Sequence, residues 1–191
     1  SQRLKKMENL YNKNGLIFWS QEEIKLRRMF EEHFSTTLLN TLRKQNAAFQ
    51  MIQIEAPILT PLEFININYD KEDMFVVDDL VLRPETTMGS YAYAKELLST
   101  HNEVKFKTPL VIWQHGKSFR KEQDQATKFM RLKEFYQLEF QIIFSPNTQN
   151  DYSIKLFPEV QKMISDLIGE CRLEESDRIP DYSEGTMDII C

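Results

Sequence analysis

The chain has 191 residues, of which 41% are hydrophobic and 28% are charged, a composition typical of a water-soluble globular domain with one core. A formal net charge of −5 argues against a general nucleic-acid-binding protein, and no apolar run approaches the roughly 20 residues of a transmembrane helix. The five glycines form neither a Walker loop nor a dinucleotide-binding fingerprint, and the two cysteines lack metal-ligand spacing and are too few for a disulfide framework. We therefore expect a reducing intracellular setting, cytoplasmic or mitochondrial.

One long helix dominates the first quarter of the chain. Ser20 and Glu23 have the spacing of a capping box, so we expect this helix to begin there and to run to about Lys44. Its apolar residues recur at helical spacing and predict a buried stripe: Met29, Phe30, Phe34, Leu38, Leu39 and Leu42. Three short features are expected ahead of it: a helix over residues 1–13, a turn at Asn14–Gly15 and a strand or buried segment over residues 16–19.

Strands dominate the rest of the chain. Alternation and turn residues predict a hairpin over residues 73–82 and strands over residues 49–55, 110–114, 116–122, 131–141 and 185–191. Two more helices are expected, one from the Arg83–Thr87 stretch to about Leu98 and one over residues 157–169 with Pro158 in its first turn. Short connections between strands predict an α+β fold, with one domain over residues 1–191 and a mixed, mainly antiparallel sheet that has its flanking helices set to one side.

Two of the predicted strands carry polar side chains on one face. Within residues 131–141 one face carries Phe135, Gln137, Glu139 and Gln141, whereas Tyr136, Leu138 and Phe140 point to the other. On the preceding strand Arg120 and Glu122 share a face with Ser118. If the two strands pair, this surface suits a ligand that is anionic, planar and partly cationic, and ATP together with an amino acid fits that description. On charge alone, the lysines and arginines between residues 117 and 133 fit a solvated hairpin equally well.

Several stretches resemble the catalytic core of the class II aminoacyl-tRNA synthetases, most of all the glycyl-tRNA synthetases. The long helix followed by residues 53–61 (QIEAPILTP) resembles motif 1 of that family, and residues 119–122 (FRKE) with 131–135 (RLKEF) resemble motif 2. Residues 82–86 (LRPET) resemble the glycine-binding stretch of the glycyl enzymes. Further likeness in two outer segments, residues 14–19 and 181–189, extends the resemblance over nearly the whole chain.

The resemblance implies that the chain activates glycine with ATP and Mg²⁺ and transfers it to tRNA. It makes Arg120 the catalytic residue, which holds the α-phosphate and the substrate carboxylate, because a guanidinium can bond two oxygens where charge builds up. It assigns ATP to four residues: Arg120, Glu122 at the adenine amino group, Arg131 at the outer phosphates and Phe135 stacked on the adenine. It assigns the amino acid to Arg83, Glu85, Gln137 and Glu139, with the two glutamates around the ammonium, and it implies no metal ligand from the protein.

Plainer readings of the same residues stay open. Phe135 could simply pack, Glu85 could favour the positive end of a helix, and Glu139 could pair with a lysine across the sheet. Met88 stands where the family usually has Gln.

The sequence also departs from the family. It contains no stretch that resembles motif 3, which carries a second ATP-binding Arg, and no anticodon-binding domain. Three hypotheses follow: a glycine-specific synthetase core, a synthetase-like accessory or regulatory protein, and an enzyme that forms an aminoacyl adenylate but charges an acceptor other than tRNA. For the first we expect a homodimer built on the motif 1 helix and the strand around Pro57, which cannot donate to a ladder and belongs at a strand end or edge.

Overall fold

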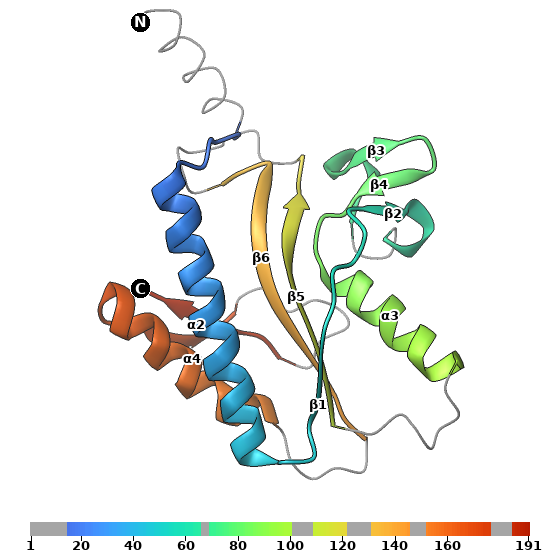
Figure 1. Ribbon diagram of the computed structural model, residues 1–191. Coiled ribbons are helices and arrows are strands. Elements are labelled where there is room, and N and C mark those ends of the chain that lie inside the picture. Colours follow the sequence, from blue (N-terminus) through green and yellow to red (C-terminus); the bar gives the residue numbers. More distant parts are fainter. Residues whose placement is uncertain (1–14, 66–68, 101–108, 122–130, 146–151, 177–184) are drawn as a thin grey trace, which may run out of the picture.

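The computed structural model describes residues 15–65, 69–100, 109–121, 131–145, 152–176 and 185–191 (Figure 1). Its elements are α2 (Gln21–Gln45), β1 (Gln50–Gln53), β2 (Leu59–Pro61), η1 (Leu62–Phe64), η2 (Lys71–Asp73), β3 (Phe75–Val77), β4 (Leu80–Leu82), α3 (Thr87–Thr100), β5 (Leu110–Phe119), β6 (Glu134–Ile143), α4 (Tyr152–Ile168), β7 (Arg172–Glu175) and β8 (Met187–Ile190). The helix expected over residues 1–13 lies outside the described residues, and residues 16–19 form no strand. None of the helices in the described part of the chain is long and apolar enough to cross a bilayer.

The central sheet has three strands in the order β1-β5-β6, with β1 parallel to β5 and β5 antiparallel to β6. The ladder between β5 and β6 runs without a break from Leu110 opposite Ile143 to Phe119 opposite Glu134. The strands expected over residues 110–114 and 116–122 are therefore one strand, because Gly116 stays in the ladder, and this strand ends at Phe119 instead of Glu122. With the small antiparallel sheet β2-β4-β3 and the β7–β8 hairpin, the mixed, mainly antiparallel α+β fold is confirmed.

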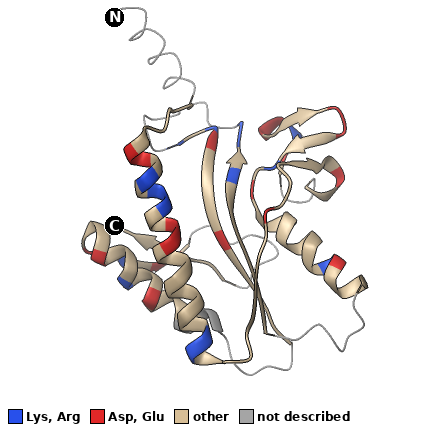
Figure 2. Cartoon of the chain, viewed as in Figure 1, with Lys and Arg blue, Asp and Glu red and all other residues tan. Residues whose placement is uncertain are grey.

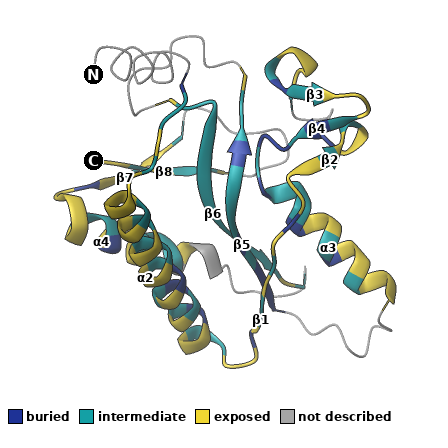
Figure 3. Cartoon of the chain, turned by 45° about the horizontal axis from the view of Figure 1, so that its top comes forward, coloured by how far each residue is buried: buried dark blue, intermediate teal, exposed yellow. Residues whose placement is uncertain are grey.

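Helices cover both faces of the central sheet, although the sequence predicted them on one side (Figure 1). On one face Val111 packs with Leu42 of α2 and Phe49, and on the other face Leu110 and Ile112 pack with Ala94 of α3. The three β5 residues are fully buried, so this end of the strand is apolar on both faces and needs a cover on each. Figure 3 shows the same contrast between β5, which is coloured buried or intermediate, and the exposed outer surfaces of α2 and α3.

The start of α2 follows the sequence closely. The Ser20 side chain accepts a hydrogen bond from the Glu23 backbone N–H at 3.3 Å, and the Glu23 carboxylate accepts one from the Ser20 N–H at 2.6 Å. The predicted apolar stripe is correct for Leu38 and Leu42, which are buried, but wrong for Met29, which is 66% exposed. Met29 lies about 100° around the helix from its neighbour Phe30 and so belongs to the outer face.

The C-terminal part of the described chain differs from expectation in two ways. Helix α4 begins at Tyr152, so Pro158 lies inside it instead of in its first turn, and the helix lacks the hydrogen bond that a proline N–H cannot make. Cys171 and Cys191, which the sequence did not pair, form a disulfide across the β7–β8 hairpin. Their Cα atoms are 4.2 Å apart because the antiparallel strands bring the two ends of this segment together.

The small sheet is a short hairpin folded against a third strand. The hairpin expected over residues 73–82 is confirmed as β3 and β4, and Asp78 takes a φ of 58° in its turn, a conformation that aspartate adopts more readily than most residues. Ile65, Met74 and Val81 form the core of this unit, with Tyr69 packed beside them. The backbone N–H of Phe119 donates to the carbonyl of Arg83, so the turn after β4 lies against the end of β5.

Candidate active site

One face of the β5–β6 ribbon carries three of the predicted site residues, Phe135, Gln137 and Glu139. The register sets Gln114 opposite Glu139, Gly116 opposite Gln137, and Ser118 opposite Phe135. Because alternate residues share a face, these six positions form one surface, which we call the site face. Arg120 follows β5 at its end, and the turn of residues 83–87 after β4 lies beside it. Figure 2 shows acidic and basic positions on β5, on β6 and on this turn.

Arg120 is held in place by contacts from three segments. Its Nε donates to the Pro84 carbonyl at 3.2 Å, and its Nη2 donates to the Tyr69 hydroxyl at 3.3 Å. The guanidinium carbon lies 5.4 Å from the centre of the Phe135 ring and 5.8 Å from the centre of the Tyr69 ring. A guanidinium set between two aromatic rings keeps its planar donor fork oriented, and such a fork suits phosphate or carboxylate oxygens.

Glu85 and Glu139 bring two carboxylates to the same region. Burial raises the pKa of Glu85 above its usual value and the charge of Glu139 acts in the same direction, whereas the hydrogen bond from Tyr69 and the charge of Arg120 lower it. Glu139 accepts hydrogen bonds from the hydroxyls of Thr86 at 2.7 Å and Thr87 at 2.9 Å. A cation placed between the two carboxylates would relieve their mutual repulsion, so this arrangement suits an ammonium group.

Arg83, which the resemblance assigned to the amino acid, is buried and bonded to backbone carbonyls. Its side chain is 4% exposed, with Nη1 donating to the Ala56 carbonyl at 2.7 Å and Nε donating to the Lys117 carbonyl at 2.8 Å. Burial lowers the pKa of its guanidinium, an effect that the charges of Glu55 and Glu139 oppose. A Cβ on Gly116 would lie 2.2 Å from Arg83 Nη2, so only glycine leaves room for this guanidinium on the sheet. Arg83 therefore joins the turn after β4 to β5 and to the segment after β1.

Gln114 completes this buried support. Its amide Nε2 donates to the Thr86 carbonyl at 2.9 Å and to the Ser90 hydroxyl at 2.8 Å, which fixes the start of α3 against β5. On the opposite strand Gln137 accepts a hydrogen bond from the Ser118 hydroxyl. The buried side chains of Gln114 and Ser118 thus support the site face through hydrogen bonds to Thr86, Ser90 and Gln137.

The remaining predicted ATP residues are placed only in part. Glu122 lies outside the described residues. Arg131 is exposed and stands directly after the undescribed segment 122–130. Arg120, Phe135, Glu85, Gln137 and Glu139 are brought together, whereas the adenine contact of Glu122 and the phosphate contact of Arg131 stay predictions.

Five residues of the site were missed from the sequence. Tyr69 ends the alternating stretch of residues 65–69 (ININY), whose period of two fits a strand, but that pattern does not mark the tyrosine as part of a site. Gln114 had one available signal, since an amide directly after the apolar run 110–113 suggests a buried hydrogen bond. The other three lie in stretches that the sequence analysis described without naming them as site residues. Thr86 and Thr87 end the Arg83–Thr87 stretch, and Gly116 begins the strand expected over residues 116–122.

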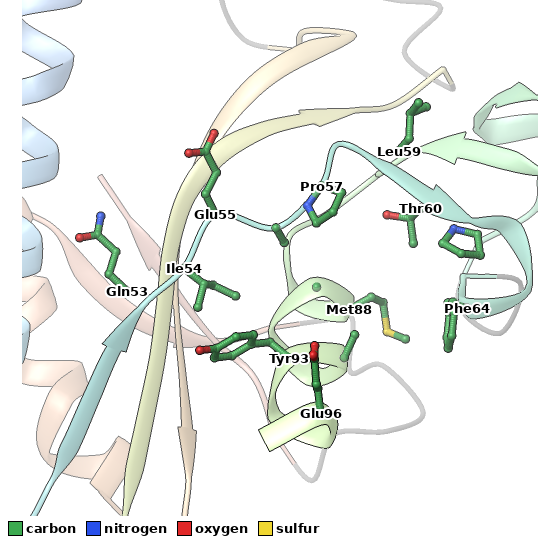
Figure 4. Close-up of a pocket in the computed structure, with 14 residues that line it drawn as sticks. Gln53, Ile54, Glu55, Pro57, Leu59, Thr60, Phe64, Met88, Tyr93 and Glu96 are labelled. Carbon is green, nitrogen blue, oxygen red and sulfur yellow. The ribbon is translucent and has the colours of Figure 1, made fainter. Parts of the chain in front are cut away.

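A groove with a volume of about 490 Å³ lies beside the first half of α3, and we call it the Pro57 groove (Figure 4). One wall is the segment from Gln53 to Pro61, and the other is α3 with Met88, Tyr93 and Glu96. In Figure 4 the Met88 side chain lies toward Phe64 in this groove, so the residue that departs from the family pattern is not part of the site face.

Comparison with known proteins places these observations in a family context. No family model matches the chain. The glycine–tRNA ligase of Mesoplasma florum is 32% identical over 114 residues, which are 56% of this chain and 25% of that protein. The chain spans about a quarter of the length of the curated relatives that it matches.

Two solved structures share the fold. The RNA-binding domain of threonyl-tRNA synthetase from Cryptosporidium parvum aligns with a TM-score of 0.63 and 18% identity, over 91% of this chain and 42% of that one. Prolyl-tRNA synthetase from the same organism, solved with halofuginone and AMPPNP, aligns with a TM-score of 0.60 and 16% identity, over 81% of this chain and 34% of that one. The chain is therefore a class II aminoacyl-tRNA synthetase-like core in its fold.

Proposed function

We propose that this chain carries the activation site of an ATP-dependent ligase that forms glycyl adenylate and transfers the glycyl group to tRNA. The observation that carries the proposal is the meeting of Arg120, Phe135 and Glu85 at one end of the β5–β6 ribbon. The sequence similarity to glycine–tRNA ligases supports glycine and tRNA as substrates. The shared fold with a synthetase solved with AMPPNP supports an adenine nucleotide.

In the proposed reaction a carboxylate oxygen of glycine attacks the α-phosphorus of ATP. The new O–P bond forms as the bond to the bridging oxygen breaks, and pyrophosphate leaves with its electron pair. Arg120 is the catalytic residue because its oriented fork can bond both the α-phosphate and the attacking carboxylate where charge accumulates. Phe135, which already flanks that guanidinium, offers its ring to the adenine, with Glu122 and Arg131 proposed at the amino group and outer phosphates.

Glu85 and Glu139 are proposed to receive the substrate ammonium. Glu139 is oriented by two threonine hydroxyls and Glu85 by Tyr69, so both carboxylates are fixed before the substrate arrives. Fixed carboxylates close around the ammonium leave little room for a side chain on the α-carbon, which favours glycine over larger amino acids. Gln137 faces the same surface and is proposed to contact the amino acid beside them.

Arg83 is proposed to act as a support of the site. Because two donors of Arg83 are bonded to backbone carbonyls, we propose that it supports the ammonium pocket from below instead of touching the substrate.

In the described part of the chain no group of three or more His, Cys, Asp or Glu residues is placed to hold a metal ion. Mg²⁺ is accordingly proposed as the companion of the ATP phosphates, where it would neutralise their charge, and no protein ligand is assigned to it.

A homodimer is proposed through α2 and the segment around Pro57. Apolar side chains stand exposed along both parts, with Met29 at 66%, Leu26 at 53%, Ile58 at 43% and Leu59 at 44%. Exposed apolar surface of this kind is typical of an interface between subunits. Sedimentation velocity at micromolar concentration should give a dimer, and a monomer there would contradict the proposal.

The activity is tested by ATP–pyrophosphate exchange with each of the twenty amino acids. The proposal predicts exchange with glycine alone, followed by transfer of labelled glycine to tRNA. Glycine-dependent exchange without transfer to tRNA would favour an adenylate-forming enzyme with another acceptor. No exchange with any amino acid, in a folded chain, would favour a synthetase-like accessory protein.

A further inference from the structure

Tyr69 lies between the two oppositely charged groups of the site. Its hydroxyl donates to Glu85 Oε2 at 3.0 Å and accepts from Arg120 Nη2 at 3.3 Å. Among the ion pairs of the described residues, Arg120 and Glu85 do not pair directly with each other. The Tyr69 hydroxyl is therefore hydrogen-bonded both to Arg120, the proposed anion-binding residue, and to Glu85, the proposed cation-binding residue, and it lies between them.

The small sheet fixes the position of this hydroxyl. Tyr69 packs beside the core of Ile65, Met74 and Val81, so its ring is anchored by an apolar cluster. The backbone N–H of Lys121 donates to the Asp73 carbonyl at 3.0 Å, which ties the residue after Arg120 to the same unit. Movement of the small sheet would consequently carry Tyr69 and the end of β5 together.

We propose that Tyr69 is a positioning residue whose hydroxyl keeps Glu85 and Arg120 apart, so that each remains available to one end of an α-amino acid. This inference rests on the proposed function. An α-amino acid carries its ammonium and its carboxylate on the same carbon, so a site for it needs a cation acceptor and an anion acceptor close together but not neutralised by each other. Without the hydroxyl, the two side chains are free to close into a salt bridge that competes with the substrate.

The ionisation of Glu85 adds a second consequence. The charged groups that face it are Arg120 after β5 and Glu139 on β6, and the Tyr69 hydrogen bond is one of the two influences that lower its pKa. If the hydroxyl is removed and Arg120 closes on Glu85 as proposed, the guanidinium charge at contact distance lowers the pKa of Glu85 further. Because only the ionised carboxylate attracts an ammonium, binding is lost as pH falls through that pKa, and in the variant the remaining binding is lost at a lower pH.

The test compares the wild-type chain with Tyr69→Phe, which keeps the ring, and with the control Tyr93→Phe on α3, outside the site face. Calorimetric titration with glycine across the acidic range should show about tenfold weaker binding for Tyr69→Phe, since the direct Arg120–Glu85 pair must open before glycine binds, and no change for Tyr93→Phe. The pH midpoint of binding should move downward only in Tyr69→Phe.

A readout without ligand separates this inference from the proposed function. The carboxyl ¹³C shifts of labelled glutamates give the titration of Glu85, assigned by its loss in Glu85→Gln. A titration of Glu85 at lower pH in Tyr69→Phe supports the inference, because a direct Arg120 pair stabilises the ionised carboxylate. A Glu85 titration that is unchanged or moved to higher pH, or an unchanged glycine affinity, overturns it. Failure of the wild-type chain to bind glycine overturns the proposed function instead.

Discussion

Replacement of Arg83 by methionine tests whether the buried guanidinium supports the site. Arg83→Met keeps the aliphatic stem but removes the donors to the Ala56 carbonyl at 2.7 Å and the Lys117 carbonyl at 2.8 Å. A hydrogen bond from a charged group contributes about 1.5 kcal/mol or more, so the loss of two should lower the free energy of unfolding by about 3 kcal/mol. The two bonds of 3.5 Å, to the Pro57 carbonyl and the Gln114 side chain, are too long to add much.

Urea denaturation followed by circular dichroism measures this change. With a slope of about 2 kcal/mol per molar urea, the midpoint should fall by about 1.5 M. The matched control is Arg28→Met, at an exposed position on α2, which should change stability by less than about 0.5 kcal/mol. If Arg83→Met were no more destabilising than the control, the two carbonyls would not depend on this guanidinium, and its assignment as a support would be wrong.

Three further predictions concern the site and the C-terminal hairpin. Arg120→Ala should reduce kcat/KM of glycine-dependent exchange by a factor equivalent to about 3 kcal/mol, like the loss of an oxyanion donor, and unchanged exchange would show that Arg120 does not hold the α-phosphate. Glu85→Gln should weaken glycine binding in calorimetry while ATP binding stays near normal, and a joint loss of both would indicate a folding defect. Cys191→Ser opens a bridge between residues separated by 20 positions and should lower the free energy of unfolding in urea denaturation by about 3 kcal/mol, and unchanged stability would show that the β7–β8 pairing alone holds the hairpin.

Local signals in the sequence were sufficient for elements that depend on neighbouring residues. The capping box at Ser20 and Glu23 appears as predicted because both of its bonds are made within three residues. The alternation of the strand predicted over residues 131–141 placed Phe135, Gln137 and Glu139 on one face, as in β6, since a strand has no other arrangement for alternate side chains.

Features that depend on distant contacts were missed or misplaced. Gly116 looked like the start of a strand, but its role is to make room for Arg83, which is 33 positions earlier in the chain. Tyr69 reaches Arg120 only because the small sheet folds against the end of β5. Helix α4 continues through Pro158 because its packing against α2 and β7 outweighs the loss of one backbone hydrogen bond.

The most direct test of the proposed site is the binding of a stable mimic of its intermediate. 5′-O-(glycylsulfamoyl)adenosine joins the adenine, the phosphate position and the glycyl ammonium in one molecule, so it should engage Phe135, Arg120 and the two glutamates together. We predict that the wild-type chain binds it, that Arg120→Ala and Glu85→Gln each weaken binding at least about tenfold, and that the alanyl analogue binds more weakly than the glycyl one. Absence of binding by the folded wild-type chain would contradict the assignment of this surface as a glycyl-adenylate site. Binding by both variants that is as tight as that of the wild-type chain would contradict it as well.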